Sequence, residues 1–237
     1  MPKVTFQRPR KIEWEVLTPG YGRIVAEPFE KGYALTVGNS LRRTLLSALP
    51  GAAVAWAKIE GVKGDTAELL LNLKSIAIKL HQDKPKTLRL ETRGPKTVTA
   101  GDLGKGDPDV ETLNPEQVLI VLEKGEKLAL EVGIRTGRGY ASAERHEGVP
   151  AGAQALDAAF SPVRRVNYAV ETSRLGKIID YEKLTVELWT NAGITPDDAL
   201  IRASQLLRDH FDLFTPAGAE EEDEEEPEGA RPGRGGD

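Results

Sequence analysis

The sequence contains no cysteine, which excludes a disulfide framework, a thiol nucleophile and a cysteine-ligated zinc site. Its three histidines, His81, His146 and His210, lie far apart and lack the spacing of metal ligands. Aromatic residues make up only 5% of the chain, which favours a core of Leu, Val, Ile and Ala. No apolar run reaches the roughly 18 residues of a membrane-spanning helix, and the N-terminus has no apolar signal core. We therefore expect a soluble, cytoplasmic protein with no cofactor, no metal ion and no membrane contact.

Motifs of catalytic chemistry are also missing. The sequence has no phosphate-binding glycine loop, because Gly137-Arg138-Gly139 lacks the rest of any such motif. It has no Gly-x-Ser-x-Gly elbow and no Asp-x-Asp-x-Asp string of the kind that holds metal ions for nucleotide polymerisation. No pair of carboxylates lies inside an apolar run, where burial would tune the pair for acid–base work. We therefore do not expect this chain to be an enzyme by itself.

Negative charge is concentrated at the C-terminal end. Residues 220–237 hold nine acidic side chains and two arginines, a net charge of −7, whereas the whole chain carries −5. The rest of the chain is therefore close to neutral, which argues neither for nor against a nucleic-acid partner. Residues 217–237 contain no bulky apolar side chain, and we expect them to form a disordered acidic tail or linker.

The N-terminal end of the chain reads as strands followed by a helix. Residues 11–37 alternate apolar and polar side chains between turn signals, which predicts three short strands. A helix is expected at 39–49, before a Pro-Gly stop, with Leu41, Leu45 and Leu49 on its apolar face.

The C-terminal end repeats this order. Strands are expected at 166–190 and a helix at 195–214, with Thr195 as its cap and Pro at its first position. The apolar side chains of the expected helix at 195–214 form a stripe along one face. A stripe of this kind usually packs inside its own chain, and a helix–helix contact between two copies is the alternative. The stripe consists of Ala199, Leu200, Ala203, Leu206, Leu207, Phe211 and Phe214.

The middle of the chain, residues 60–165, predicts a second, β-rich region. It contains one amphipathic helix at 66–73, four alternating strands and several long connections rich in Gly and Pro. Connections of this kind are often contact loops rather than core. Together, the three regions predict an α+β protein.

Two pairs of arginines, Arg42-Arg43 and Arg164-Arg165, are the clearest candidates for partner contacts. Each pair is either a solvated surface or a set of guanidinium groups suited to bidentate pairing with carboxylates across an interface. The residues alone do not distinguish a protein partner from a nucleic acid.

Several strings of residues, in order along the chain, resemble the N-terminal assembly domain of the bacterial RNA polymerase alpha subunit. The likeness covers roughly residues 10–215. The strings are Glu27-Pro28-Phe29-Glu30-Lys31-Gly32-Tyr33 with the following Gly38-Asn39-x-Leu41-Arg42-Arg43, Leu71-Asn72-Leu73-Lys74, Gly137-Arg138-Gly139-Tyr140, and Phe160-Ser161-Pro162-Val163-Arg164-Arg165-Val166.

This resemblance implies a non-catalytic scaffold that forms a homodimer and nucleates assembly of the beta and beta-prime subunits of RNA polymerase. It implies a dimerisation subdomain made of residues 1–52 and 166–216, with antiparallel strands and two helices, and an inserted β-rich subdomain at 53–165. The dimer interface it implies consists of Leu41, Leu45, Leu49, Leu200, Ala203, Leu206, Leu207 and Phe211.

The same resemblance implies two sets of contacts with the large subunits. Arg42, Arg43 and Lys74 lie in blocks that face the beta subunit in the family. The block that faces beta-prime contains Arg174, Asp180 and Lys183. The family's longer loop near 60–65 is shortened here, and its Arg-Thr-Asp string is Ile178-Ile179-Asp180.

Two alternatives follow from these departures. Because the sequence ends within an apparent acidic linker, before the family's DNA-binding domain, we expect no specific DNA binding from it. A freestanding, shortened paralogue that sequesters one large subunit is therefore the first rival. A small enzyme is the second, and it predicts perturbed carboxylates or histidines gathered in one pocket.

Overall fold

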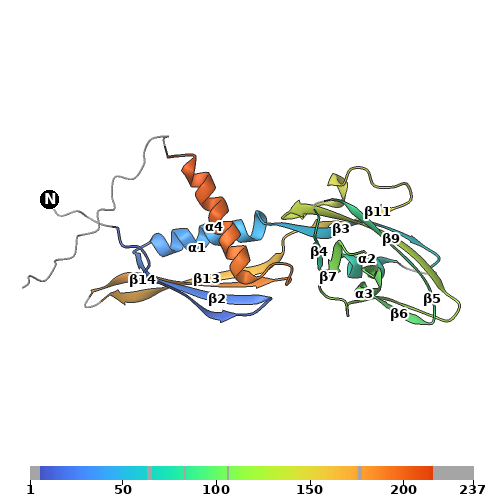
Figure 1. Cartoon of the computed structure of the whole chain (residues 1–237), viewed down its shortest axis with the longest axis horizontal. Helices are drawn as coiled ribbons and strands as arrows, with labels where there is room; N and C mark the ends of the chain where they lie inside the picture. The colour runs from blue at the N-terminus through green and yellow to red at the C-terminus, as the bar shows by residue number, and fades with distance from the viewer. Residues whose placement is uncertain (1–5, 63–65, 83, 106, 176–177, 216–237) are drawn as a thin grey trace, which may run out of the picture.

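The computed structural model describes residues 6–62, 66–82, 84–105, 107–175 and 178–215. Two parts lie end to end in an elongated molecule (Figure 1). The α1/α4 part comprises residues 6–49 and 163–215, and the β3–β12 part comprises residues 50–162. Helices and mostly antiparallel strands are mixed in the molecule, which confirms the expected α+β class.

The α1/α4 part is a four-stranded antiparallel sheet with two helices on one face. The sheet has the order β1-β2-β14-β13, and its strands are β1 (Lys11–Leu17), β2 (Tyr21–Glu30), β13 (Val163–Leu175) and β14 (Ile178–Thr190). Helices α1 (Tyr33–Ser47) and α4 (Pro196–Asp212) cross each other over this sheet (Figure 1). The core between the layers contains Leu184, Val186 and Leu188 from β14, because alternate residues of a strand point to the same face.

Helix α1 begins six residues before the expected position, so the strand predicted at 33–37 is wrong. Gly32, with a φ of 83°, turns the chain out of β2, and the helix starts directly after it. The alternation of Tyr33, Leu35 and Val37 was misleading, because the residues that face the sheet follow a helical spacing of four, three and four. These buried or half-buried residues are Ala34, Gly38, Leu41 and Leu45.

The β3–β12 part is built on a curved six-stranded sheet. Its main path has the order β5-β9-β3-β4-β7, and β11 pairs with β3. These strands are β3 (Pro50–Glu60), β4 (Ile78–Leu80), β5 (Lys86–Arg93), β7 (Val110–Thr112), β9 (Lys127–Arg138) and β11 (Gln154–Ala155). Two further pairs complete the part: β6 (Lys96–Thr99) with β8 (Val118–Leu122), and β10 (Tyr140–Ala141) with β12 (Ala158–Ala159).

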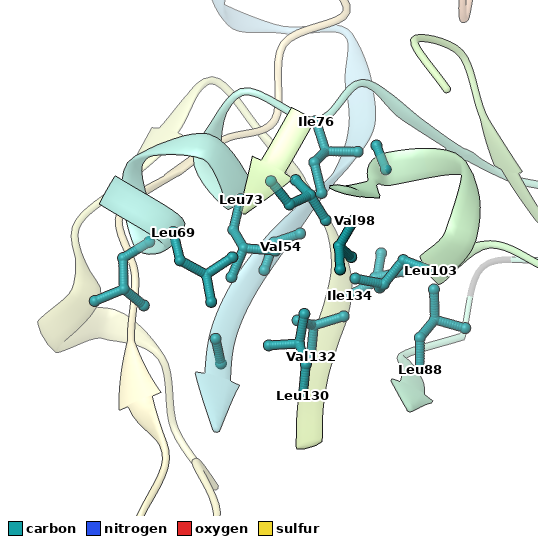
Figure 2. Close-up of a cluster of buried hydrophobic side chains, with 14 of the residues drawn as sticks. Val54, Leu69, Leu73, Ile76, Leu88, Val98, Leu103, Leu130, Val132 and Ile134 are labelled. Carbon is teal, nitrogen blue, oxygen red and sulfur yellow. The ribbon is translucent and has the colours of Figure 1, made fainter. Parts of the chain in front are cut away.

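A large aliphatic core fills most of this second part (Figure 2), and Ala53, Ala158 and Phe160 form a smaller buried cluster. Helix α2 (Ala67–Lys74) contributes Leu69 and Leu73, and it lies one residue later than the helix expected at 66–73. The short helices α3 (Ala100–Leu103) and η1 (Ala143–Arg145) were not expected, because four-residue and three-residue elements leave no periodic signal.

Phe160 lies at the junction of the two parts. Gly51 of β3 pairs with Gly137 of β9, and a β-carbon at Gly137 would lie 2.6 Å from the Phe160 ring. A β-carbon at Gly51 would overlap the carbonyl oxygen of Phe160. The Phe160 N–H donates to the carbonyl oxygen of Gly139 at 2.8 Å. The two glycines therefore allow a close backbone approach, and they bring the 137–140 and 160–166 strings together.

The remaining expectations differ mainly in their bounds. The strand expected at 75–80 forms only over Ile78–Leu80, and Pro50-Gly51 opens strand β3 instead of forming a turn. The Arg164-Arg165 pair lies among the first three residues of β13, which begins three residues before the strand start expected at 166. The acidic tail predicted at 217–237 lies outside the described residues.

Candidate subunit interfaces

Helix α4 carries a partly uncovered apolar stripe. Ala199 and Ala203 pack fully buried against the rest of the part, and Leu200, Leu206 and Leu207 are half-buried beside them. Phe211 continues the flank of the stripe and is 62% exposed. Beyond the crossing with α1, the C-terminal half of α4 projects away from the sheet (Figure 1), so its apolar side chains have little of their own chain to cover them.

Three of the eight residues expected in a dimer interface need correction. Leu45, Leu49 and Ala203 are buried in the core of their own chain, so they present almost no surface to a second copy. The periodicity placed them on the correct helix face, but the inner half of that face packs on the sheet. The five residues with surface left to offer are Leu41, Leu200, Leu206, Leu207 and Phe211.

Further exposed apolar residues lie at the start of α1 and directly after the end of α4. Tyr33 and Leu35 are exposed on the first turn of α1, and the ring of Phe6 packs edge-on against Tyr33 with 4.9 Å between centroids. Leu213 and Phe214 follow the end of α4 and are also exposed. Periodicity selected Phe214 as the end of the stripe, but it did not select the others, because they lie off the main stripe or beyond the helix ends.

Arg42 and Arg43 are both exposed on α1, as expected for partner contacts. Arg42 lies over a shallow hollow beside the edge strand β13, lined by Asn167, Tyr168 and Glu187. The backbone carbonyl of Arg43 accepts a bond from the Ser47 hydroxyl at 2.7 Å, and its guanidinium faces solvent.

Lys74, the third residue expected to face beta, lies on α2 in the other part of the molecule. Its Nζ atom is 3.0 Å from Oδ2 of Asp157, and Oδ1 of Asp157 accepts a 3.0 Å hydrogen bond from the backbone N–H of Ala143. The Ala143 N–H and then Lys74 lower the pKa of the Asp157 carboxyl, with a smaller contribution from Tyr140. The Asp157 carboxylate therefore joins three segments that are distant in the sequence.

The residues expected to face beta-prime lie on the β13–β14 hairpin, at the end of the molecule away from the β3–β12 part (Figure 1). Arg174 and Asp180 are exposed, and Asp180 pairs with Lys31 at 3.3 Å. Lys183 pairs with Glu171 across the hairpin at 2.5 Å, and the hydrogen bond to Glu171 raises the pKa of Lys183. The side chains of Ile178 and Ile179 lie outside the described residues.

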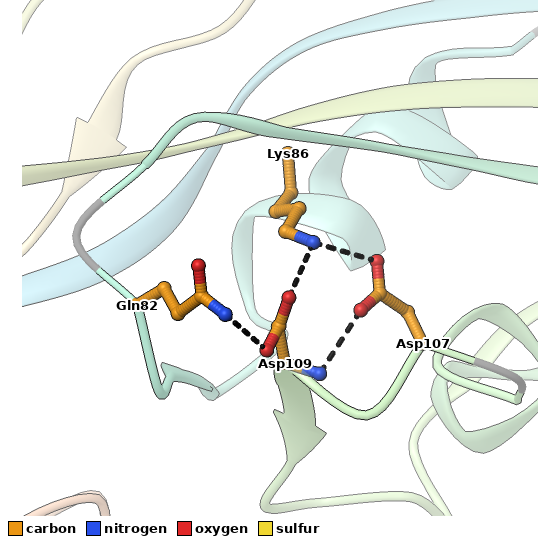
Figure 3. A network of polar contacts seen from close by, with 4 residues as sticks. All are labelled: Gln82, Lys86, Asp107 and Asp109. Atoms are coloured by element: carbon orange, nitrogen blue, oxygen red, sulfur yellow. Dashed lines mark hydrogen bonds and ion pairs between the residues drawn. The ribbon is translucent and has the colours of Figure 1, made fainter.

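A separate polar network lies directly before β7 in the β3–β12 part (Figure 3). Lys86 Nζ lies 2.6 Å from Asp109 Oδ2 and 3.5 Å from Asp107 Oδ2, and Gln82 Nε2 donates to Asp109 Oδ1 at 2.9 Å. The hydrogen bond from Lys86 lowers the pKa of Asp109. The single lysine thus offsets one of the two negative charges, and the network ties the residues directly before β7 to strand β5.

The described residues contain no group of His, Asp and Glu arranged to hold a metal ion. The carboxyls with shifted pKa values, which include Asp102, Asp109, Asp157 and Glu171, are spread over separate ion pairs and hydrogen bonds, and every shift is downward. A general acid requires a raised carboxyl pKa. No helix in the described part of the chain is long and apolar enough to cross a membrane.

Comparison with known proteins identifies the family. Residues 52–161 match the model of the RNA polymerase Rpb3/RpoA insert domain, which corresponds to the β3–β12 part. The chain is 49% identical over 216 residues to the DNA-directed RNA polymerase subunit alpha of Moorella thermoacetica, with 86% of this chain and 69% of the relative covered. The chain belongs to the family of RNA polymerase alpha subunits.

Other relatives agree in name and in extent. The alpha subunit of Symbiobacterium thermophilum is 45% identical over 86% of this chain and 69% of its own length. The alpha subunit of Alkaliphilus metalliredigens is 44% identical over 89% of this chain and 71% of its own length. Alpha subunits are components of DNA-directed RNA polymerase, a nucleotidyltransferase complex, and the predicted resemblance is confirmed.

Asp157 and Tyr140 are the interface candidates that sequence reasoning missed. Asp157 lies between Leu156 and two alanines, with no local pattern to mark it. Tyr140 closes the Gly-Arg-Gly-Tyr string, which the resemblance quoted without giving the tyrosine a role. Only the fold brings the two residues beside Lys74.

Proposed function

We propose that this alpha-subunit chain acts as a homodimeric scaffold on which the beta and beta-prime subunits assemble. The observation that carries the proposal is the concentration of exposed apolar side chains on α1 and α4. A contiguous apolar surface on a soluble domain is typical of a protein interface. A surface that meets its own copy across a two-fold axis buries every one of its residues twice, so a modest patch suffices for a stable dimer.

The dimerisation subdomain in this proposal is formed by residues 1–52 and 166–216. Leu41, Leu200, Leu206, Leu207 and Phe211 supply its helix–helix contact, and Leu45, Leu49 and Ala203 support it from beneath. Helix α4 is anchored on one side by small buried residues, and its flank carries large apolar residues. This arrangement suits a contact between two crossed helices.

The large subunits in this proposal bind outside the dimer contact. Arg42, Arg43 and Lys74 contact beta, and Arg174, Asp180 and Lys183 contact beta-prime. Two observations support these assignments. Arg42, Arg43 and Arg174 are exposed, and Asp157 holds Lys74 in place. Guanidinium and ammonium groups that are already positioned lose less entropy when a partner carboxylate binds.

Reconstitution with purified large subunits tests this function. The chain is mixed with beta, beta-prime or both, and the complexes are separated by gel filtration with light scattering and assayed for transcription. We expect two copies of the chain with one beta, and addition of beta-prime should complete an active core. A dimer that stalls with one large subunit would favour a sequestering paralogue instead. A chain that binds neither subunit contradicts the scaffold.

The matched variants are Arg43→Ala and Arg208→Ala, which remove one exposed arginine from α1 and one from α4. Arg43→Ala should weaken beta binding and leave the dimer intact, because Arg43 points away from the sheet. Arg208→Ala, a position with no assigned contact, should affect neither. Loss of the dimer in Arg43→Ala would mean that α1 presents this face to its own copy.

A further inference from the structure

A cleft lies where the two parts of the molecule meet (Figure 1). Its volume is about 510 Å³, which is in the range of small-molecule sites, and such sites occur preferentially between domains. One wall consists of the turn at 191–195 and the first turns of α4. The other wall consists of the start of β3, strand β4 and residues 81–82. A molecule bound in the cleft would therefore touch both parts at once.

The turn that precedes α4 is a preformed wall of this cleft. The Asn191 N–H donates to the carbonyl oxygen of Pro162 at 2.9 Å, and the Gly193 N–H donates to Asn191 Oδ1 at 2.9 Å. Ala192 has a φ of 64°, a left-handed conformation that persists in a non-glycine residue only where the surrounding structure fixes it. Gly193 also approaches the other part closely, because a β-carbon there would lie 3.0 Å from Leu113. The wall therefore needs little ordering when a ligand binds.

Two cationic side chains line the cleft from opposite walls. Arg202 comes from α4 and Lys79 from β4, and both are exposed. Among the described residues, no carboxylate lies within ion-pair distance of either group. The described lining holds one carboxylate, Asp198, and His81 contacts Glu111 with 3.5 Å between Nε2 and Oε2. The cations thus outnumber the carboxylate, and a dianion with acceptor oxygens directed to both walls suits them.

The lining also includes an apolar set from both walls. Ile78 and Pro162 are buried, and Leu80 and Ile194 are half-buried. A mostly apolar lining with a few charged groups that fix orientation is typical of small-molecule sites. The cleft therefore suits a ligand that combines an anionic group with an apolar body.

We propose that this cleft binds a small organic phosphate with an apolar body, such as an aryl phosphate, and that Lys79 and Arg202 contact its phosphate group. The ligand would bridge the two parts of the molecule and restrict the angle between them. Lys79 and Arg202 belong to none of the contacts assigned to the dimer or to the large subunits. The site is therefore independent of the proposed function.

The test is an NMR titration of the full-length chain, labelled at the isoleucine methyl groups, with phenyl phosphate. Ile78 and Ile194 line opposite walls, so their signals should shift together with one shared Kd. We expect a Kd of about 1 mM for a ligand of about eleven non-hydrogen atoms. Ile12, which is 63% exposed on β1, is the internal control, and its signal should not move.

Single substitutions test the two cations. Arg202→Gln should raise the Kd for phenyl phosphate about tenfold, and Lys79→Gln should raise it about fivefold, because each removes a charge from the site. Arg208→Gln is the matched control, since it removes an exposed arginine of the same helix that does not line the cleft. Its Kd should stay within about twofold of the wild type. Unchanged signals of the buried Ile24 and Ile134 verify that each variant is folded.

Two further ligands separate the charge from the apolar body. Inorganic phosphate has the charge alone and benzyl alcohol has the body alone, so each should bind at least about tenfold more weakly than phenyl phosphate. Equal binding of inorganic phosphate would overturn the proposal, because the site would then hold an ion only. An unchanged Kd in Arg202→Gln would overturn the assigned contact. Ile78 and Ile194 signals that stay fixed at every soluble concentration of phenyl phosphate would overturn the site and leave the scaffold proposal untouched.

Discussion

Large apolar side chains point inward in the β3–β12 part, whereas many of them face outward in the α1/α4 part. Among the described residues, ten of the fourteen exposed large hydrophobic side chains belong to the α1/α4 part, including Phe211, Leu213 and Phe214. The β3–β12 part closes its sheet around a large aliphatic core (Figure 2). The β3–β12 part therefore buries most of its large apolar residues within its own chain, whereas the α1/α4 part leaves many of them exposed, as expected of a surface that binds a partner.

This difference predicts that core substitutions in the β3–β12 part affect folding and not association. Leu73→Ala removes a fully buried side chain and should lower the free energy of unfolding by about 3 kcal/mol. Leu71→Ala on the same helix is the control, and it should change stability by less than about 0.5 kcal/mol. Urea denaturation measures both. Equal losses for the two variants would show that α2 is not packed as described.

Substitutions on α4 should have the opposite effect. Phe211→Asp places a charge in the proposed dimer contact and should weaken dimerisation by about 2 kcal/mol or more. Because Phe211 is exposed in the single chain, the fold of the protomer should be retained, as judged by circular dichroism. Gln205→Asp, at an exposed position that points about 120° away from Phe211 around the same helix, should leave the dimer unchanged. Dimers that persist in Phe211→Asp would place the contact elsewhere.

The packing at the junction between the two parts can be tested without changing the core of the β3–β12 part or the α4 surface. Gly137→Ala forces its new methyl group against the Phe160 ring and should cost about 1–3 kcal/mol of stability. At Gly20 the nearest atom to a new β-carbon is 3.8 Å away, so Gly20→Ala should be tolerated. Thermal unfolding compares them. The chain has no native cysteine, so pairs of spin labels on introduced cysteines can also report the angle between the two parts.

Acidification should affect the β3–β12 part through the Lys86–Asp109 pair (Figure 3). The folded-state pKa of Asp109 lies below its unfolded value, so the stabilisation is fully present above about pH 4. It is lost as the pH falls through the folded-state pKa. Because the groups are partly exposed, the effect should be small. Urea midpoints between pH 3 and 7 should fall less steeply in Lys86→Gln than in the wild type.

The sequence predicted much of this fold because its patterns are strong where the elements are regular. Strands β1 and β2 lie within the stretch expected to form strands, and α2 and α4 are each within two residues of their expected bounds. The quoted strings identified the family before any contact was known. Helix α1 was placed too late because Tyr33, Leu35 and Val37 alternate like a strand. A helical glycine, Gly38, packs against Leu184 and Tyr168, and no local pattern distinguishes such a glycine from a turn.

The interface residues were harder to predict, for a physical reason. Helical periodicity identifies the apolar face, but it does not say which half of that face packs on the chain's own sheet. Leu45 and Ala203 belong to the inner half, and Phe211 belongs to the part of α4 that extends past the sheet. The partnership of Lys74 with Asp157 joins residues more than eighty positions apart, so it depends on the topology of the fold alone.

The most direct test of the account is the mass of the wild-type chain in solution, measured by sedimentation equilibrium over a range of micromolar concentrations. We predict twice the chain mass of 25.8 kDa, because the proposed dimer covers the outward apolar face of α1 and α4 with a second copy. A single-chain mass at every concentration would contradict the account, since the two parts of the molecule would then be equally self-sufficient.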